Sequence, residues 1–270
     1  MPTLAISREV GDQASEGSLL NNLGLLCNEQ GRMVEARSHY EAALAIHRES
    51  ADRRDEGLVL GNLGNVFLDR GLLDEAQTCY EQALRLTRDV GDRRFEGMIL
   101  GNLGSMNFMR GRMGETRQHL DASLAIHREV GNRRSEGIVL GNLGALHRST
   151  GDLPEAQRCF AQSLASHRSL GLRRHVGIAL AHQADLLREL GQLGPAQTAF
   201  DESEAALREV HDQFELAKLL SWRCKAWRAL GDTDRARAAL AEAEAIAEQI
   251  DAKPDSELMR GIASARDLTA

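Results

Sequence analysis

The chain of 270 residues is 42% hydrophobic and 27% charged, a balance typical of proteins that fold in water. Its formal net charge of −7 argues against nucleic acid as a partner, because binding to polyphosphate needs a basic surface. No apolar run approaches membrane-spanning length, and the N-terminal residues lack the basic-then-apolar order of a signal peptide. We therefore expect a cytoplasmic protein with no membrane partner.

The most informative feature is a ten-residue pattern that returns every forty residues. The run LVLGNLGNVF at 58–67 recurs as MILGNLGSMN at 98–107 and as IVLGNLGALH at 138–147. An earlier copy begins at Ser18, and weaker copies begin at Ile178 and Lys218. A fixed period over most of a chain indicates one structural unit stacked on copies of itself, rather than a single globular core.

Each unit has the pattern of two helices joined by a turn. Apolar residues at positions 4, 7 and 11 have helical spacing, and a glycine at position 15 predicts the end of the first helix. Asp152 followed by Pro154 and Glu155 predicts the start of a second helix. Small residues at positions 8 and 20 predict that the two helices approach closely, with a bulky residue at position 24 beyond them. Positions are counted from Gly17, Gly57, Gly97, Gly137, Gly177 and Ala217.

Leu-Gly at positions 7 and 8, Ala at 20, a bulky residue at 24 and a small one at 27 resemble the tetratricopeptide repeat (TPR) signature. The forty-residue unit with N-L-G resembles the variant of Pins-type cell-polarity adaptors. It is also similar to the TPR regions of bacterial signalling ATPases, kinases and cyclases. The resemblance covers about 14–250 and is strongest in the first four units. It implies an all-α, right-handed superhelical solenoid of antiparallel helix pairs.

The resemblance divides the chain into six repeats with a partial unit at each end. The predicted divisions are a partial repeat (second helix only) at 1–16, repeats at 17–56, 57–96, 97–136 and 137–176, degenerate repeats at 177–216 and 217–253, and a capping helix at 254–270. Residues 4–17 align with 44–57, so we expect the chain to begin inside a second helix. Such a start favours either a part of a longer protein or an edge that pairs with another copy.

The resemblance places the first helices along a concave groove, where position 6 would face a ligand. A side-chain amide donates to and accepts from a peptide backbone, so a ladder of asparagines suits an extended peptide. The alternative is that the asparagines tie neighbouring helices together. Position 6 holds Asn22, Asn62, Asn102 and Asn142, followed by His182 and Trp222.

Positions 2 and 12 add to this predicted groove. Apolar residues at position 2 would contact ligand side chains, and they argue against a chaperone-type carboxylate clamp, which has lysine there. They are Leu58, Met98, Ile138 and Ile178. Position 12 becomes basic at Arg148, Arg188 and Arg228, which would favour an acidic or phosphorylated ligand toward the C-terminal repeats. The alternative is that these arginines pair with local acids such as Asp185 and Glu189.

We find no motif for catalysis or metal binding. His47, His127 and His167 share position 31 and lie one repeat apart, too far to hold one metal ion, so they are expected to be surface or inter-repeat residues. The GNLG tetrads lack the lysine and the strand of a phosphate loop. The four cysteines form no CxxC pair and no Cys/His cluster, which favours reduced thiols.

The sequence therefore predicts a non-enzymatic scaffold that binds an extended protein or peptide segment, with no catalytic residue, metal or cofactor. Two alternatives stay open. The chain is a regulatory or sensor region of a larger bacterial signalling protein (an ATPase, kinase or cyclase), or it self-associates through its uncapped N-terminal edge.

Overall fold

A computed structural model describes residues 12–30, 32–250, 252 and 256–267, and the only regular elements in those ranges are thirteen α-helices. The expected all-α class is thus confirmed. The partial second helix expected at the N-terminus falls on residues outside the described part. In the described residues no helix is long and apolar enough to cross a membrane.

The forty-residue period appears as a strict alternation of equal helices. All but the last have 17 residues, and three-residue turns separate them. They are α2 (Gln13–Glu29), α3 (Met33–Glu49), α4 (Arg53–Asp69), α5 (Leu73–Asp89), α6 (Arg93–Met109), α7 (Met113–Glu129), α8 (Arg133–Ser149), α9 (Leu153–Ser169), α10 (Arg173–Glu189), α11 (Leu193–Glu209), α12 (Gln213–Ala229), α13 (Thr233–Gln249) and α14 (Glu257–Arg266). The first helix of each pair with glycine at position 1 begins four residues before that glycine. The predicted division of the chain into repeats stays a prediction.

Aspartates begin many of these helices. The side chain of Asp52 accepts a hydrogen bond from the backbone N–H of Asp55, and Asp92 caps Phe95 in the same way. Such an N-cap satisfies one of the backbone donors that the first turn leaves unpaired. The chain between helices turns through the left-handed region, for example at Gly71 with φ of 72°. The period is therefore encoded in its turns as well as in its apolar stripe.

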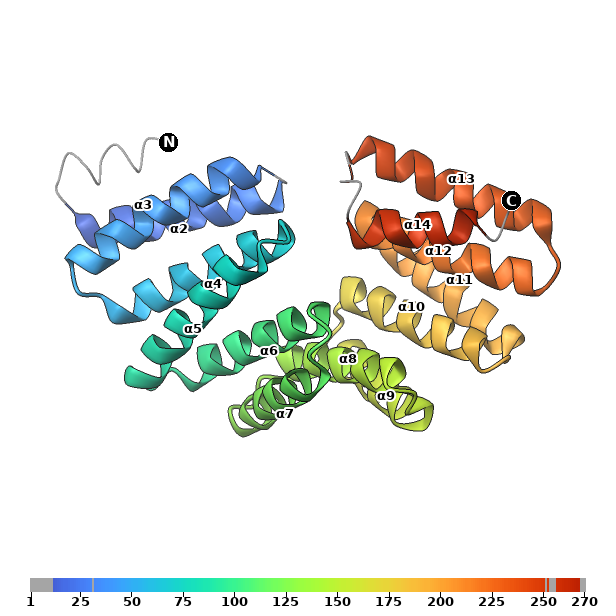
Figure 1. Cartoon of the computed structure of the whole chain (residues 1–270), viewed down its shortest axis with the longest axis horizontal. Coiled ribbons are helices and arrows are strands. Elements are labelled where there is room, and N and C mark those ends of the chain that lie inside the picture. The colour runs from blue at the N-terminus through green and yellow to red at the C-terminus, as the bar shows by residue number, and fades with distance from the viewer. Residues whose placement is uncertain (1–11, 31, 251, 253–255, 268–270) are drawn as a thin grey trace. The chain divides into compact units, whose positions relative to one another are not determined.

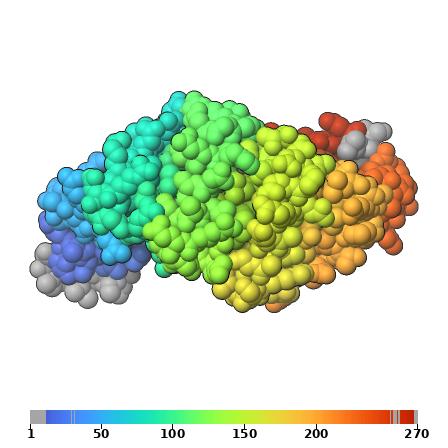
Figure 2. All heavy atoms as spheres, turned by 90° about the horizontal axis from the view of Figure 1, so that it is seen from below, coloured from blue at the N-terminus to red at the C-terminus, as the bar shows by residue number. Residues whose placement is uncertain are grey.

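The chain forms two compact units, residues 1–135 and 136–270. In the first unit the most extensive contacts are within the pairs α2–α3, α4–α5 and α6–α7, and in the second within α10–α11 and α12–α13. The two members of a pair run antiparallel (Figure 1). First helices also contact one another, α2 with α4 and α4 with α6 in the first unit, and α10 with α12 in the second. Within each unit the helices follow in chain order across the surface (Figure 2).

Close approach within a pair depends on the glycine at position 8. A Cβ added to Gly64 would lie 2.5 Å from Cε1 of Tyr80, which is fully buried on the partner helix. The same contact recurs in the first unit between Gly104 and Leu120. Because the aromatic ring or leucine occupies the space of the missing side chain, the small–large pair sets the spacing of the two helices.

We expect Gly64→Ala to lower the free energy of unfolding by about 1–2 kcal/mol, since overpacking against Tyr80 outweighs the gain in helix propensity. Gly114 in α7 is the matched control, because a Cβ there would meet no atom within 4 Å. Gly114→Ala should raise the free energy of unfolding by about 0.5–1 kcal/mol. Urea denaturation followed by far-ultraviolet circular dichroism measures both, and stabilisation by both variants would contradict the packing argument.

The helix expected near the C-terminus is present as α14. Leu258, Ile262 and Ala265 are buried on one face, and α14 contacts α12 and α13. The side chain of Ser256 accepts a hydrogen bond from the N–H of Met259 and so caps its start. We propose that α14 caps the second unit, because it covers apolar surface that a further repeat would otherwise bury.

Candidate functional site

Two of the predicted asparagines join neighbouring first helices in the first unit. The side-chain Nδ2 of Asn62 donates to Oδ1 of Asn21 on α2 at 2.9 Å, and that of Asn102 donates to Oδ1 of Asn65 on α4, also at 2.9 Å. The helix-tying arrangement that the sequence left as the alternative is therefore observed at both residues. Each bond uses one of the two N–H donors of its amide. Asn22 is exposed on α2, and Asn142 on α8 is half-buried.

The apolar residues at position 2 reach the surface to different extents. Met98 is 42% exposed and Ile138 39% exposed, whereas Leu58 and Ile178 are half-buried. Ile178 packs against the core of the second unit. Positions 2 and 6 are four residues apart on one helix, so Met98 shares a face with Asn102. In α6 this face thus combines an exposed thioether with a side-chain amide.

On α10 and α12 the predicted site changes character, because the aromatic rings of His182 and Trp222 replace the amides at position 6. The rings of His182 and Trp222 lie 5.2 Å apart, and His182 stacks on Phe160 at 5.4 Å. The ammonium of Lys218 lies 5.7 Å from the Trp222 ring. Burial, together with the positive charges of Lys218 and Arg148, lowers the pKa of His182 to about 3, so the imidazole is neutral at pH 7.

The predicted basic residues at position 12 are mostly paired. Arg148 donates to Glu189 at 2.8 Å and to the buried Asp185 at 2.5 Å. Arg188 donates to the second oxygen of Asp185 at 2.7 Å. Pairing with local acids, the alternative that the sequence left open, is therefore observed for both. Arg228 is exposed on α12 and has no ion pair among the described residues.

The histidines at position 31 do not lie on the surface, which corrects one of the two expectations from sequence. The other, contact between repeats, is observed for His167, whose ring lies 5.0 Å from that of His175 on α10. His47, His127 and His167 are almost fully buried. Each ring fills the space above the glycine at position 1 of the same helix pair, as with His167 Cε1, which would lie 2.6 Å from a Cβ on Gly137. A second small–large contact thus supports each pair, with the imidazole as the large member.

Two features escaped the sequence patterns. Arg223 replaces the leucine of the Leu-Gly signature, contacts the carboxylates of Asp201 and Glu204, and lies 5.6 Å from the ring of Trp227. These residues line a cleft of about 420 Å³ between α11, α12 and α13. The replacement of the Leu-Gly pair by Arg223-Cys224 was the signal available in the sequence. It did not reveal the carboxylates that pair with Arg223, because they lie on α11.

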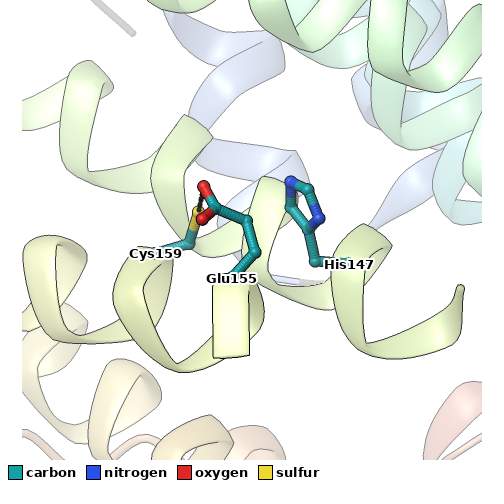
Figure 3. A group of neighbouring side chains, drawn as sticks. All are labelled: His147, Glu155 and Cys159. Atoms are coloured by element: carbon teal, nitrogen blue, oxygen red, sulfur yellow. Dashed lines mark hydrogen bonds between the residues drawn. The ribbon is translucent and has the colours of Figure 1, made fainter. Parts of the chain in front are cut away.

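The second feature is a group of His147, Glu155 and Cys159 (Figure 3). The sequence predicted that cysteine and histidine form no cluster. This prediction is wrong here, because the ligand atoms of the three side chains lie within 4.8 Å of one another. They occupy positions 11, 19 and 23 of one repeat, on two helices, so no short motif contains them. A search for metal-ligating residue types at positions that face each other across a helix pair could have revealed them.

Comparison with known proteins agrees with this architecture. Residues 15–89, 95–169 and 135–209 match a tetratricopeptide repeat family model, and residues 217–242 match a second one. The matches span well over half of the chain, which therefore belongs to the tetratricopeptide repeat family. Among curated protein sequences none matches the chain.

Several solved structures share the fold at low sequence identity. A Rap protein complexed with competence and sporulation factor is 15% identical, with a TM-score of 0.72, and the match covers 94% of this chain and 74% of that one. PilF from Pseudomonas aeruginosa is 20% identical, with a TM-score of 0.60, and the match covers 94% and 99%. A STAND signal-transduction ATPase with a tetratricopeptide sensor, from Pyrococcus horikoshii, is 14% identical, with a TM-score of 0.69. That match covers 99% of this chain and 41% of that one.

Proposed function

We propose that the chain is a non-enzymatic interaction scaffold that binds an extended peptide segment along its first helices. The observation that carries the proposal is the shared face of α6, where the exposed Met98 lies one turn from the amide of Asn102. An apolar side chain beside an amide is the combination that an extended peptide needs, since it offers both side-chain and backbone contacts. The structure of the Rap protein with its factor supports the idea that an array of this fold can hold a ligand.

The geometry also refines the expected ligand. Asn62 and Asn102 each use one N–H between helices, so the remaining N–H and the carbonyl oxygen would meet the peptide backbone. Arg148 and Arg188 are already neutralised by Asp185 and Glu189. Of the three arginines at position 12, Arg228 is therefore the one that would favour an acidic ligand segment.

Peptides selected on the full-length chain from a displayed library of random linear 12-residue sequences would test the proposal. We expect Met98→Glu to weaken binding of the selected peptides at least tenfold, as measured by isothermal titration calorimetry, because a charge would replace an apolar contact. Val90→Glu is the matched control, since Val90 is also 42% exposed but lies at the C-terminal cap of α5. Equal effects of the two variants, or selection of no peptide, would contradict binding at this face.

A second candidate is the regulatory or sensor region of a larger signalling protein. The match to the STAND ATPase supports it, because a tetratricopeptide sensor occupies part of that longer chain. Sequencing the gene on both sides of the segment that encodes this chain tests the idea, and an in-frame ATPase, kinase or cyclase domain is the expected result. Self-association through the N-terminal edge is a separate proposal, and light scattering over a range of concentrations would show a constant monomer mass if it is wrong.

A further inference from the structure

Three different metal-ligating side chains meet where the turn after α8 leads into α9. His147 comes from the last turn of α8, and Glu155 and Cys159 come from the first two turns of α9. Figure 3 shows the imidazole facing the carboxylate, with the thiol beside it. The thiol sulfur lies 3.9 Å from a carboxylate oxygen of Glu155. We propose that His147, Glu155 and Cys159 form a binding site for a divalent ion of the zinc type.

The local fold orients these groups. Glu155 and Cys159 are four residues apart on α9 and therefore share one face of the helix. Asp152 caps α9 by accepting from the N–H of Glu155, and its other oxygen lies 3.3 Å from Nδ1 of His147. A carboxylate behind a ligating histidine is the usual outer contact in zinc sites. Since Asp152 faces Nδ1, we assign Nε2 as the ligand.

The donor set determines the kind of ion. Imidazole nitrogen, thiolate sulfur and carboxylate oxygen together suit zinc and similar borderline ions rather than magnesium or calcium, which prefer oxygen alone. A tetrahedral zinc ion requires its ligand atoms to be about 3.3–3.8 Å apart. The three ligand atoms already lie within 4.8 Å of one another, so small side-chain rotations would bring them to this spacing. Three protein ligands leave the fourth position for water or a partner's side chain.

Access and competing contacts permit such a site. Cys159 and His147 are buried, whereas Glu155 is about a third exposed and gives the ion a route from solvent. The carboxylate of Glu155 currently pairs with Arg158, which is one turn away and largely exposed. An exposed ion pair of this kind contributes little to stability, so the carboxylate can transfer to a metal ion at small cost.

Other repeats of the same chain provide internal references. The second repeat has Phe67, Glu75 and Cys79 at the corresponding positions, and burial raises the pKa of the Cys79 thiol to about 11. It thus keeps the carboxylate and thiol but lacks the imidazole. The first repeat has the three residue types with cysteine and histidine exchanged, as Cys27, Glu35 and His39. Within the described residues, however, the ligand atoms of that set do not come together as those of the fourth repeat do.

Cobalt(II) added to the reduced full-length chain is the direct probe, because thiolate coordination produces a charge-transfer band in the near ultraviolet. We expect one equivalent of cobalt(II) to bind per chain, to produce this band and to be displaced by zinc. His147→Phe reproduces the residue of the second repeat, and it should weaken binding by at least 10–100-fold. Cys159→Ala should abolish the band, and Cys27→Ser is the matched control that should keep it.

Circular dichroism of each variant separates loss of the site from loss of the fold. Absence of the band in the unmodified chain would overturn the proposal. So would a band that survives Cys159→Ala, or one that disappears equally in Cys27→Ser.

Discussion

Tyr80→Ala is expected to lower the free energy of unfolding by about 4 kcal/mol. Tyr80 is fully buried, and its ring fills the space above Gly64. Its hydroxyl donates to Oδ1 of Asn65 at 2.7 Å, and the same oxygen accepts from Asn102 on the next first helix. Truncation would thus open a cavity within one helix pair and also remove a member of the polar network between pairs.

Urea denaturation of the full-length chain, followed by circular dichroism, measures this effect. Tyr80→Phe is the conservative control, because phenylalanine stands at the same repeat position as Phe160 and Phe200, where it is fully buried. That variant loses only the hydroxyl and should cost about 1 kcal/mol. If both substitutions were equally costly, the hydrogen bond rather than ring packing would dominate, contrary to the argument.

Acidification from pH 7 to pH 4.5 should destabilise the second unit by about 2 kcal/mol through His182 alone. The folded chain holds the pKa of His182 near 3, whereas an unfolded histidine has a pKa of about 6.5. Between these values the unfolded state binds one more proton. The contribution of His182 to the free energy of unfolding is therefore full above pH 6.5 and declines as pH falls toward 3. One proton over two pH units corresponds to about 2.7 kcal/mol, and the value is reduced because His182 is only partly buried.

The two tryptophans of the chain, Trp222 and Trp227, both lie in α12, so their fluorescence follows unfolding of the second unit. His182→Asn is the matched control, because asparagine occupies this position in the first four repeats. The carboxylates titrate in both proteins, and the difference between them isolates the histidine. Parallel stability curves for the two proteins from pH 7 to pH 4.5 would show that His182 does not carry the effect.

Much of the fold could be predicted from sequence because its determinants are local and repeated. The apolar stripe, the turn glycines and the small residue at position 8 lie close together in the chain, and each recurs forty residues later. The predicted helix pairs and the C-terminal helix follow from such patterns and are present. The small residue at position 8 does mark a close approach, but the side chain that fills the space above Gly64 is Tyr80 at position 24. The family assignment follows from them as well.

The partners of the polar residues could not be predicted in this way, because they depend on how neighbouring helices are aligned. Sequence left two roles open for Asn62 and Asn102, and the alignment of adjacent first helices places Asn21 and Asn65 within hydrogen-bonding distance. The same holds for Arg148, whose acids lie about forty residues away on α10. His147 meets Cys159 only because α8 and α9 fold against each other. A repeat period specifies which residues share a face, whereas the packing of that face against its neighbours specifies what each side chain contacts.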